Sequence, residues 1–179
     1  MPGISIHLAV ANKHLETHKI KDKDAFILGS VSPDLEDDGK NRHHPSPDFR
    51  DSVISFLKGK VNLKECLPDF DINTDFGKGY FLHLVTDYEF SRALLKNEDR
   101  YRDLSYREFK DLLYHDYAVT NKYFIDKYNV VFPEVVKEFS ASEDGTPAIL
   151  ELEEIDKFIE WLGALDLDEY LSDYLSSEY

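Results

Sequence analysis

The sequence predicts an all-α fold, a compact multi-helix bundle formed by a single domain over residues 1–179. Apolar residues recur with helical spacing along most of the chain, and no linker or internal repeat divides it. Alternating patterns of strand length are nearly absent; the one short β-like run is 129–132, and Pro133 ends it. Apolar residues make up 42% of the chain and aromatic residues 13%, a composition typical of a globular domain with a substantial core.

The first half of the chain predicts three helices before its central one. Ile4, Leu8 and neighbouring apolar residues form one stripe on the first helix, and Asp24 is a candidate N-cap for the second. Pro33 lies near the end of the second helix, and Gly59 ends the third. The predicted ranges are 4–19, 24–31 and about 48–58, separated by a polar loop at 35–46 and followed by an irregular stretch at 60–74.

The second half predicts four longer helical patterns. Residues 140–147, which contain Gly145 and Pro147, are expected to form a turn before the third of these patterns. The last pattern places several leucines among acidic residues, which indicates an amphipathic closing helix. The predicted ranges are 75–96, 105–128, 148–162 and 166–177.

The charge of the chain excludes several classes of partner. Its formal net charge is −15, whereas binding to nucleic acid or to an anionic membrane needs clustered Lys and Arg. No apolar run approaches the ~18 residues of a membrane span, and the N-terminus has no basic region followed by an apolar stretch. We therefore expect a cytoplasmic protein without nucleic-acid partner or stable membrane association. A single cysteine, Cys66, excludes an intramolecular disulfide.

The helix at 75–96 is apolar almost all round, so we expect it in the middle of the bundle. His83 and Asp87 are four residues apart and therefore lie on the same face of this helix. A buried carboxylate requires a cation or a full set of hydrogen bonds. A metal ion would satisfy both side chains, because imidazole nitrogen and carboxylate oxygen are both zinc ligands. The alternative is a hydrogen-bonded Asp–His pair inside the bundle.

Further candidate ligands lie on other segments of the first half. His7 is at the edge of the apolar stripe of the first helix, and Asp34 follows Ser-Pro where a buried helix opens into a loop. His43 and His44 lie in that loop. Each of these residues alone has an ordinary structural interpretation. Together with His83 and Asp87, they supply the imidazoles and carboxylates that suit one or two zinc ions, or another divalent metal, in a hydrolytic site.

The segments that carry these residues resemble the zinc-dependent phospholipase C family. The resemblance lies in Ile-His7-Leu-Ala, in Phe-Ile-Leu-Gly-Ser-Val-Ser-Pro-Asp34, in His44, and in Gly-Tyr-Phe-Leu-His83-Leu-Val-Thr-Asp87. It covers residues 1–90, about half of the chain, and is greatest to the short bacterial members of that family. The resemblance implies an all-α fold with a zinc cluster between helices. It also implies that Asp34, His44 (preferred over His43), His83 and Asp87 hold one zinc, while His7 shares a second with a bridging Asp87.

The chain departs from this family after residue 90. The phospholipases carry a further zinc on later histidines and a glutamate with HxxxE spacing, whereas this chain has one later histidine, His115, with Val119 four residues on. By helical rotation His115 falls on the polar side of its helix, and Asp116 falls closer to the apolar side. Both are candidate ligands for a third site, and we expect at most two tightly bound metals, held by residues of the first half with Asp116 as a candidate addition.

Two functions follow from these residues. The first is a metal-dependent hydrolase of a small-molecule phosphoester, with Asp34 as the candidate general base. The alternative is a non-catalytic helical protein of the same fold, in which a structural metal or a buried polar network stabilises the bundle.

Overall fold

The computed structural model describes residues 2–35, 42–43, 52–59, 61–137, 141–142 and 145–177. Within these residues all regular secondary structure is helical, with no strand, so the predicted all-α fold is confirmed. The helices are α1 (Ile4–Thr17), α2 (Lys23–Leu35), α3 (Val53–Lys58), α4 (Leu63–Cys66), η1 (Leu67–Asp69), α5 (Asp75–Lys96), η2 (Glu98–Arg100), α6 (Tyr106–Lys127), α7 (Leu152–Gly163) and α8 (Leu167–Ser177).

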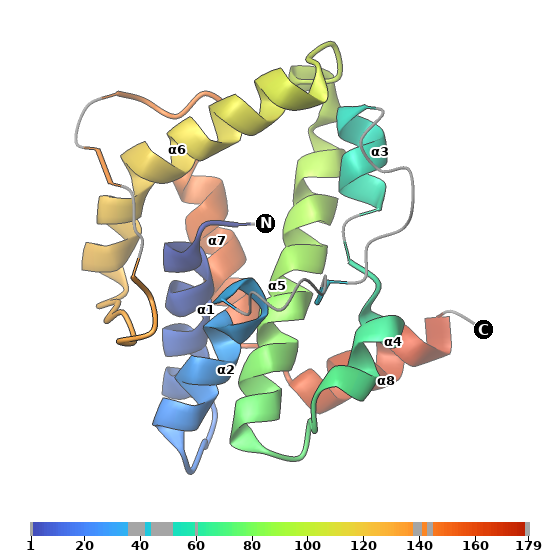
Figure 1. Cartoon of the computed structure of the whole chain (residues 1–179), viewed down its shortest axis with the longest axis vertical. Helices are drawn as coiled ribbons and strands as arrows, with labels where there is room; N and C mark the ends of the chain where they lie inside the picture. The colour runs from blue at the N-terminus through green and yellow to red at the C-terminus, as the bar shows by residue number, and fades with distance from the viewer. Residues whose placement is uncertain are drawn as a thin grey trace.

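Helix α5 is the centre of the bundle, as its apolar sequence predicts. It contacts α1, α2, α3, α4 and α8, and Figure 1 shows α1 and α2 on one side of it and α3 and α4 on the other. Every residue from 80 to 87 is buried. Its bounds agree with the predicted 75–96, because Thr74 caps the first turn by accepting the backbone N–H of Gly77 at 2.9 Å.

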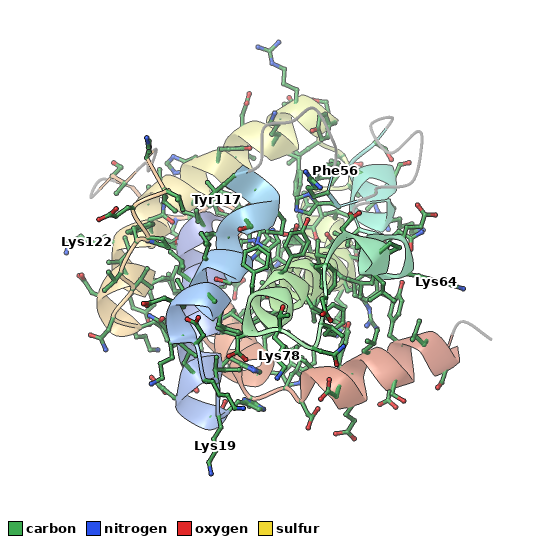
Figure 2. All side chains as sticks on the ribbon, turned by 60° about the horizontal axis from the view of Figure 1, so that its bottom comes forward. Lys19, Phe56, Lys64, Lys78, Tyr117 and Lys122 are labelled. Carbon is green, nitrogen blue, oxygen red and sulfur yellow. The ribbon has the colours of Figure 1, made fainter. Side chains whose placement is uncertain are left out.

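The core lies between α5 and the helices packed around it. It is rich in aromatic side chains, of which Phe26, Phe81, Phe90, Phe109 and Phe124 are among the largest that are fully buried. The charged side chains of Lys19, Lys64 and Lys122 point away from the body of the molecule (Figure 2). In the part of the chain that the structure describes, no helix is long and apolar enough to cross a membrane.

Several predicted boundaries are wrong in the first half. Helix α2 begins at Lys23, because the carboxylate of Asp22, not Asp24, accepts the backbone N–H of Ala25 at 3.0 Å. It continues through Pro33 to Leu35. The stretch 60–74 is not irregular throughout: Asn62 accepts the N–H of Glu65 and thereby caps α4, and η1 follows. Helix α3 begins after Ser52, and residues 48–51 of its predicted range lie outside the described residues.

The short β-like run at 129–132 is not a strand but the end of α6. Asn129 has φ 49°, and the backbone N–H of Val130 donates to the carbonyl oxygen of Ile125 at 3.0 Å. This is the hydrogen-bond pattern that closes a helix through a left-handed residue. Val130 is buried and contributes to the core, which explains why its neighbourhood is apolar.

Helix α7 begins at Leu152, four residues later than predicted. The carboxylate of Asp116 accepts the backbone N–H groups of Ala148, Ile149 and Leu150 at 2.6–2.8 Å. These residues are thereby held in an irregular conformation beside α6, and the helix can start only after them.

Candidate metal centre

The candidate site is built around His83 and Asp87 on α5. The two side chains lie one helical turn apart with no exposed surface, and His83 Nε2 is 3.7 Å from Asp87 Oδ2. The sequence places both on one face of a buried helix, and the structure agrees. A carboxylate in this position needs positively charged or hydrogen-bonding neighbours.

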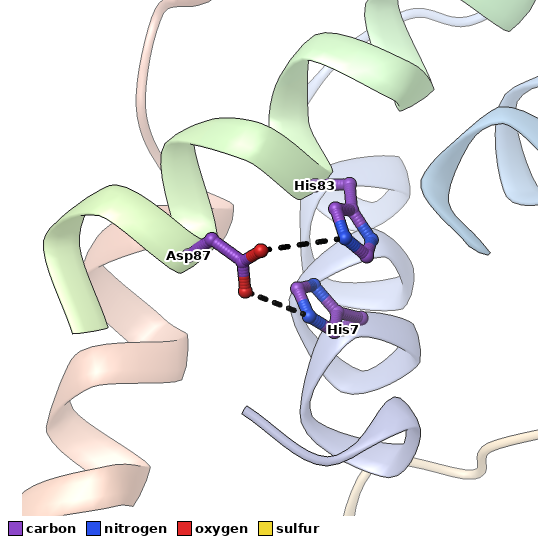
Figure 3. Close-up of side chains that lie close together, drawn as sticks. All are labelled: His7, His83 and Asp87. Atoms are coloured by element: carbon purple, nitrogen blue, oxygen red, sulfur yellow. Dashed lines mark ion pairs between the residues drawn. The ribbon is translucent and has the colours of Figure 1, made fainter. Parts of the chain in front are cut away.

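Helix α1 brings His7 to the same place. The rings of His7 and His83 stack with their centroids 3.8 Å apart and their planes 6° from parallel. His7 Nε2 lies 3.4 Å from Asp87 Oδ1, so Asp87 faces His83 with one oxygen and His7 with the other (Figure 3). That distance is longer than an ordinary N–H···O hydrogen bond, and neither ring nitrogen of buried His7 makes a hydrogen bond within the described residues.

Helix α2 and the segment after it supply the remaining side chains. Asp34, on the last turn of α2, places Oδ1 3.5 Å from the Nε2 atoms of both His83 and His43. His43 Nε2 lies 2.8 Å from Asp87 Oδ2 and 3.3 Å from His83 Nε2. Two groups of potential ligand atoms result, one of His7, His83 and Asp87, the other of Asp34, His43 and His83.

The orientation of His83 is fixed by a backbone group. Its Nδ1 lies 2.8 Å from the carbonyl oxygen of Ser30 on α2. A carbonyl can only accept, so Nδ1 carries the proton of this hydrogen bond. In the neutral ring Nε2 then keeps a lone pair, and it points toward Asp34 and Asp87. An outer hydrogen bond of this kind is what usually sets the tautomer of a metal-binding histidine.

Two glycines allow α2 and α5 to approach closely enough for this contact. A Cβ at Gly29 would lie 2.0 Å from the backbone oxygen of Phe76, and a Cβ at Gly79 would lie 2.0 Å from that of Phe26. Any side chain at either position would push the helices apart. The sequence analysis did not single out this pair, although the glycines in an otherwise apolar pattern were the available signal.

The distances between donor atoms fit a metal ion. Ligand atoms bound to tetrahedral zinc at 2.0–2.1 Å lie about 3.3 Å from one another. The five separations given above among Asp34 Oδ1, His43 Nε2, His83 Nε2 and Asp87 Oδ2 range from 2.8 to 3.7 Å. Donors of the right chemistry therefore lie at metal-ligand spacing in two groups that share His83. His7 Nε2 lies 3.4 Å from Asp87 Oδ1 in one of these groups.

Burial and neighbouring charges have opposing effects on several pKa values in this cluster. Burial lowers the pKa of His7 to about 4, an effect that adjacent His83 strengthens. Burial also lowers the pKa of His43. For His83 burial acts in the same direction, but the negative charge of Asp34 outweighs it and raises the pKa. Burial alone would raise the pKa of Asp87, yet neighbouring positive charge and the close approach of His43 and His7 hold it well below its usual value.

The carboxyl group of Asp34 behaves similarly but is open to solvent. Burial tends to raise its pKa, and His83 more than compensates, so the pKa is lowered and the group is ionised at neutral pH. Its side chain is 32% exposed, against 13% for His43 and none for His83 and Asp87. The accessible side of the cluster is therefore the Asp34 side.

The other sequence candidates lie elsewhere. His115 is exposed, and its Nε2 is 3.2 Å from the carbonyl oxygen of Thr146. Asp116 is fully buried as expected, but both of its oxygens accept backbone N–H groups from 148–150. Neither residue belongs to a group of potential ligands in the described chain. His44, the histidine favoured by the family resemblance, lies outside the described residues. His43, the other candidate in that loop, lies in the cluster.

Comparison of the chain with protein-family models, with curated proteins and with solved structures gives no match.

Proposed function

We propose that His7, Asp34, His43, His83 and Asp87 bind one or two divalent metal ions, zinc in the first place, and that the protein hydrolyses a small phosphoester. The observation that carries this proposal is the close spacing of donor atoms in the cluster, where His43 and His83 each lie 2.8 to 3.7 Å from a carboxylate oxygen of Asp34 and of Asp87. Imidazole and carboxylate together suit zinc and related first-row metals rather than magnesium or calcium, which prefer oxygen ligands alone.

Asp87 is the candidate bridge between two ions. Its Oδ2 faces His43 and His83, and its Oδ1 faces His7. The first ion would have four protein ligands. The second would have only His7 and Asp87, which leaves positions for water and substrate, as a hydrolytic site requires.

A zinc ion in such a site lowers the pKa of a bound water to about 7 and polarises a phosphoryl oxygen. The chain contributes Asp34, whose partly exposed carboxylate is ionised at neutral pH and lies at the accessible side of the cluster. We propose that the oxygen of Asp34 not directed at the histidines accepts the proton of the attacking water. The Ser30 carbonyl keeps His83 oriented with Nε2 toward the metal.

The acidic surface restricts the substrate. With a net charge of −15, the chain repels extended polyanions, so we propose a small phosphoester as substrate rather than a nucleic acid. This agrees with the phosphoester chemistry that the family resemblance implies.

The alternative function is structural. If Asp34, His43, His83 and Asp87 all bound one ion, they would complete a tetrahedral set, which is the usual arrangement of structural zinc sites. In that case the metal, or the polar network alone, would join α1, α2 and α5 without catalysis.

Three measurements on the same preparation separate these functions. The protein is purified without chelator, its metal content is determined by elemental analysis, and hydrolysis of bis(p-nitrophenyl) phosphate and p-nitrophenyl phosphate is followed with added zinc. The proposal expects bound metal and a hydrolysis rate that His83→Ala removes and His115→Ala leaves unchanged. Bound metal without hydrolysis favours the structural alternative, and absence of metal binding after zinc titration leaves only the polar network.

The same assay decides which loop histidine is a ligand. His43→Ala is expected to lower zinc affinity at least 10-fold, as removal of a ligand would. A loss of affinity in His44→Ala with none in His43→Ala would instead assign the ligand to His44, as the resemblance implies.

A further inference from the structure

A cavity lies away from the metal centre. It has a volume of about 60 Å³ and is formed between the C-terminal half of α5, the start of α7 and the segment 149–151. None of its lining residues belongs to the candidate metal centre. A single water needs about 10–15 Å³ of such space, so this cavity has room for a small molecule.

The walls of the cavity are mainly apolar. Phe90, Leu94, Ile149, Leu150, Ile155 and Phe158 line it, and all are buried. Apolar walls with few polar groups are typical of small-molecule sites, in which the polar groups determine orientation.

The polar group that matters is the hydroxyl of Tyr101, another lining residue. Tyr101 is only 2% exposed, and its hydroxyl has no hydrogen-bond partner within the described residues. Burial, assisted by the charge of Glu98, raises the pKa of this phenol, so the hydroxyl keeps its proton and can donate. Buried hydroxyl groups are rarely left unpaired, because they lose their hydrogen bonds to water without replacement.

Charges at the rim restrict what can enter. Arg100 forms an ion pair with Glu151, with 2.6 Å between Nη2 and Oε1, and Glu154 adds a further acidic group. The rim is therefore negative on balance and has no unpaired cation among its lining residues to receive an anionic ligand.

We propose that this cavity binds a small, neutral, apolar molecule that carries one hydrogen-bond acceptor, and that the hydroxyl of Tyr101 donates to that acceptor. The apolar walls enclose the body of the molecule, and Asn97 at the edge of the cavity is the neighbouring polar side chain. This site is independent of the metal centre and of the function proposed for it.

Two probes of nearly the same shape test the proposal. Cyclobutanone carries a carbonyl acceptor, and methylenecyclobutane has a CH₂ group in its place. Their dissociation constants are measured on the full chain by ¹H–¹⁵N NMR titration, following the amides of Leu150 and Ile155. The wild-type protein is expected to bind cyclobutanone on the order of fivefold more tightly than methylenecyclobutane, the preference that one neutral hydrogen bond confers.

Two variants complete the test. Tyr101→Phe is expected to bind both probes equally and to retain the wild-type Tm, because the hydroxyl has no partner to lose. Ala93→Phe, which places a ring in the cavity from α5, is expected to abolish binding of both probes while the helical circular dichroism spectrum is retained. Equal binding of both probes by the wild type, or no binding up to their solubility limits, would overturn the proposal and leave a cavity that holds water only. A fall of several degrees in the Tm of Tyr101→Phe would also overturn it, because the hydroxyl would then have a partner in the unliganded protein.

Discussion

The Nδ1 atom of His83 lies 2.8 Å from the backbone carbonyl oxygen of Ser30, a residue 53 positions earlier in the chain. The contact exists because α2 and α5 cross at Gly29 and Gly79, where each helix backbone approaches the missing side chain of the other. Helix packing at two glycines thus determines which nitrogen of His83 is available to a metal. The crossing of α2 and α5 therefore affects both the packing of the bundle and the chemistry of the site.

Gly79→Ala is expected to destabilise the protein by about 2 kcal/mol or more and to weaken zinc binding, because the new Cβ overlaps the backbone of Phe26 and separates the two helices. Alanine is the better helix former by about 1 kcal/mol, so a destabilising effect can come only from packing. Denaturant unfolding of the metal-free protein measures the change. Ser91→Ala, a small change at a buried position on the same helix, is the control and should be close to neutral. A stabilised Gly79→Ala would show that the helices do not cross this closely.

The bridging role that we propose for Asp87 predicts unequal losses of metal from the variants of the site. Asp87→Ala is expected to remove both ions, whereas His7→Ala should remove only the ion that faces Asp87 Oδ1. His83→Ala should abolish binding of at least one ion. Elemental analysis of zinc per chain after gel filtration measures all three. If both His83→Ala and Asp87→Ala retain the full metal content, these residues form only a structural pair.

At most two tightly bound metal ions are expected, with weak or no hydrolysis of phosphatidylcholine. His115→Ala should leave the metal content unchanged, because His115 is exposed and lies outside both groups of potential ligands. A third zinc per chain that is lost in His115→Ala would contradict this expectation and support phospholipase activity.

Asp116 is expected to act on stability rather than on metal binding. Asp116→Asn should cost about 3 kcal/mol, because a carboxylate that accepts three backbone N–H groups becomes an amide with one acceptor oxygen. Asp126→Asn, at an exposed site on the same helix where Asp126 pairs with Lys122, should change stability by less than about 1 kcal/mol. Thermal and denaturant unfolding in the presence of EDTA measure both variants. Loss of zinc from Asp116→Asn with unchanged stability would make Asp116 a ligand after all.

His14 is expected to make stability depend on pH. It is 3% exposed, and burial together with the adjacent His18 lowers its pKa from 6.5 to about 4. Lys78 acts in the same direction, while the Gly163 carbonyl and Asp166 oppose it. Above pH 6.5 the ring is neutral in both folded and unfolded states. Between pH 6.5 and about 4 the unfolded chain binds a proton that the folded chain does not, so stability falls as the pH falls.

The contribution of His14 to this loss is about 3 kcal/mol across that window. His14→Phe keeps an aromatic ring against His18 and Phe26 but cannot titrate. The metal-free variant should therefore lose less stability than the wild type between pH 7.5 and pH 4.5 in denaturant unfolding. Parallel pH profiles for the two proteins would contradict the buried neutral state of His14.

The central helix and its two site residues were predictable from the sequence. Helical spacing over 75–96 places His83 and Asp87 on one face, and the apolar surroundings require that face to be buried. These are local properties: the rotation between residues i and i+4 is set by helix geometry alone. The helical pattern over 105–128 likewise agrees with α6, Tyr106–Lys127, whose first turn the structure shows to be closed by a capping box of Ser105 and Glu108.

Boundaries that depend on distant partners were not predictable in this way. Helix α7 begins late because Asp116 takes the amides of 148–150, and the apolar run at 129–132 closes α6 instead of forming a strand. Local propensity does not report a hydrogen bond between residues 32 to 34 positions apart.

The sequence by itself determined the fold class and the chemical inventory of the site: helices, imidazoles and carboxylates, with His83 and Asp87 at their centre. Only the tertiary structure decided that His7 stacks on His83, that His43 reaches Asp87, and that Asp116 caps backbone amides. The physical reason is that sequence periodicity reports only on residues close together in the chain. Periodicity specifies which face of a helix a side chain occupies, but the distance between side chains on different helices depends on how the helices cross. Here that crossing depends on Gly29 and Gly79, which lie 50 positions apart in the chain and each approach the backbone of the other's helix only in the folded protein.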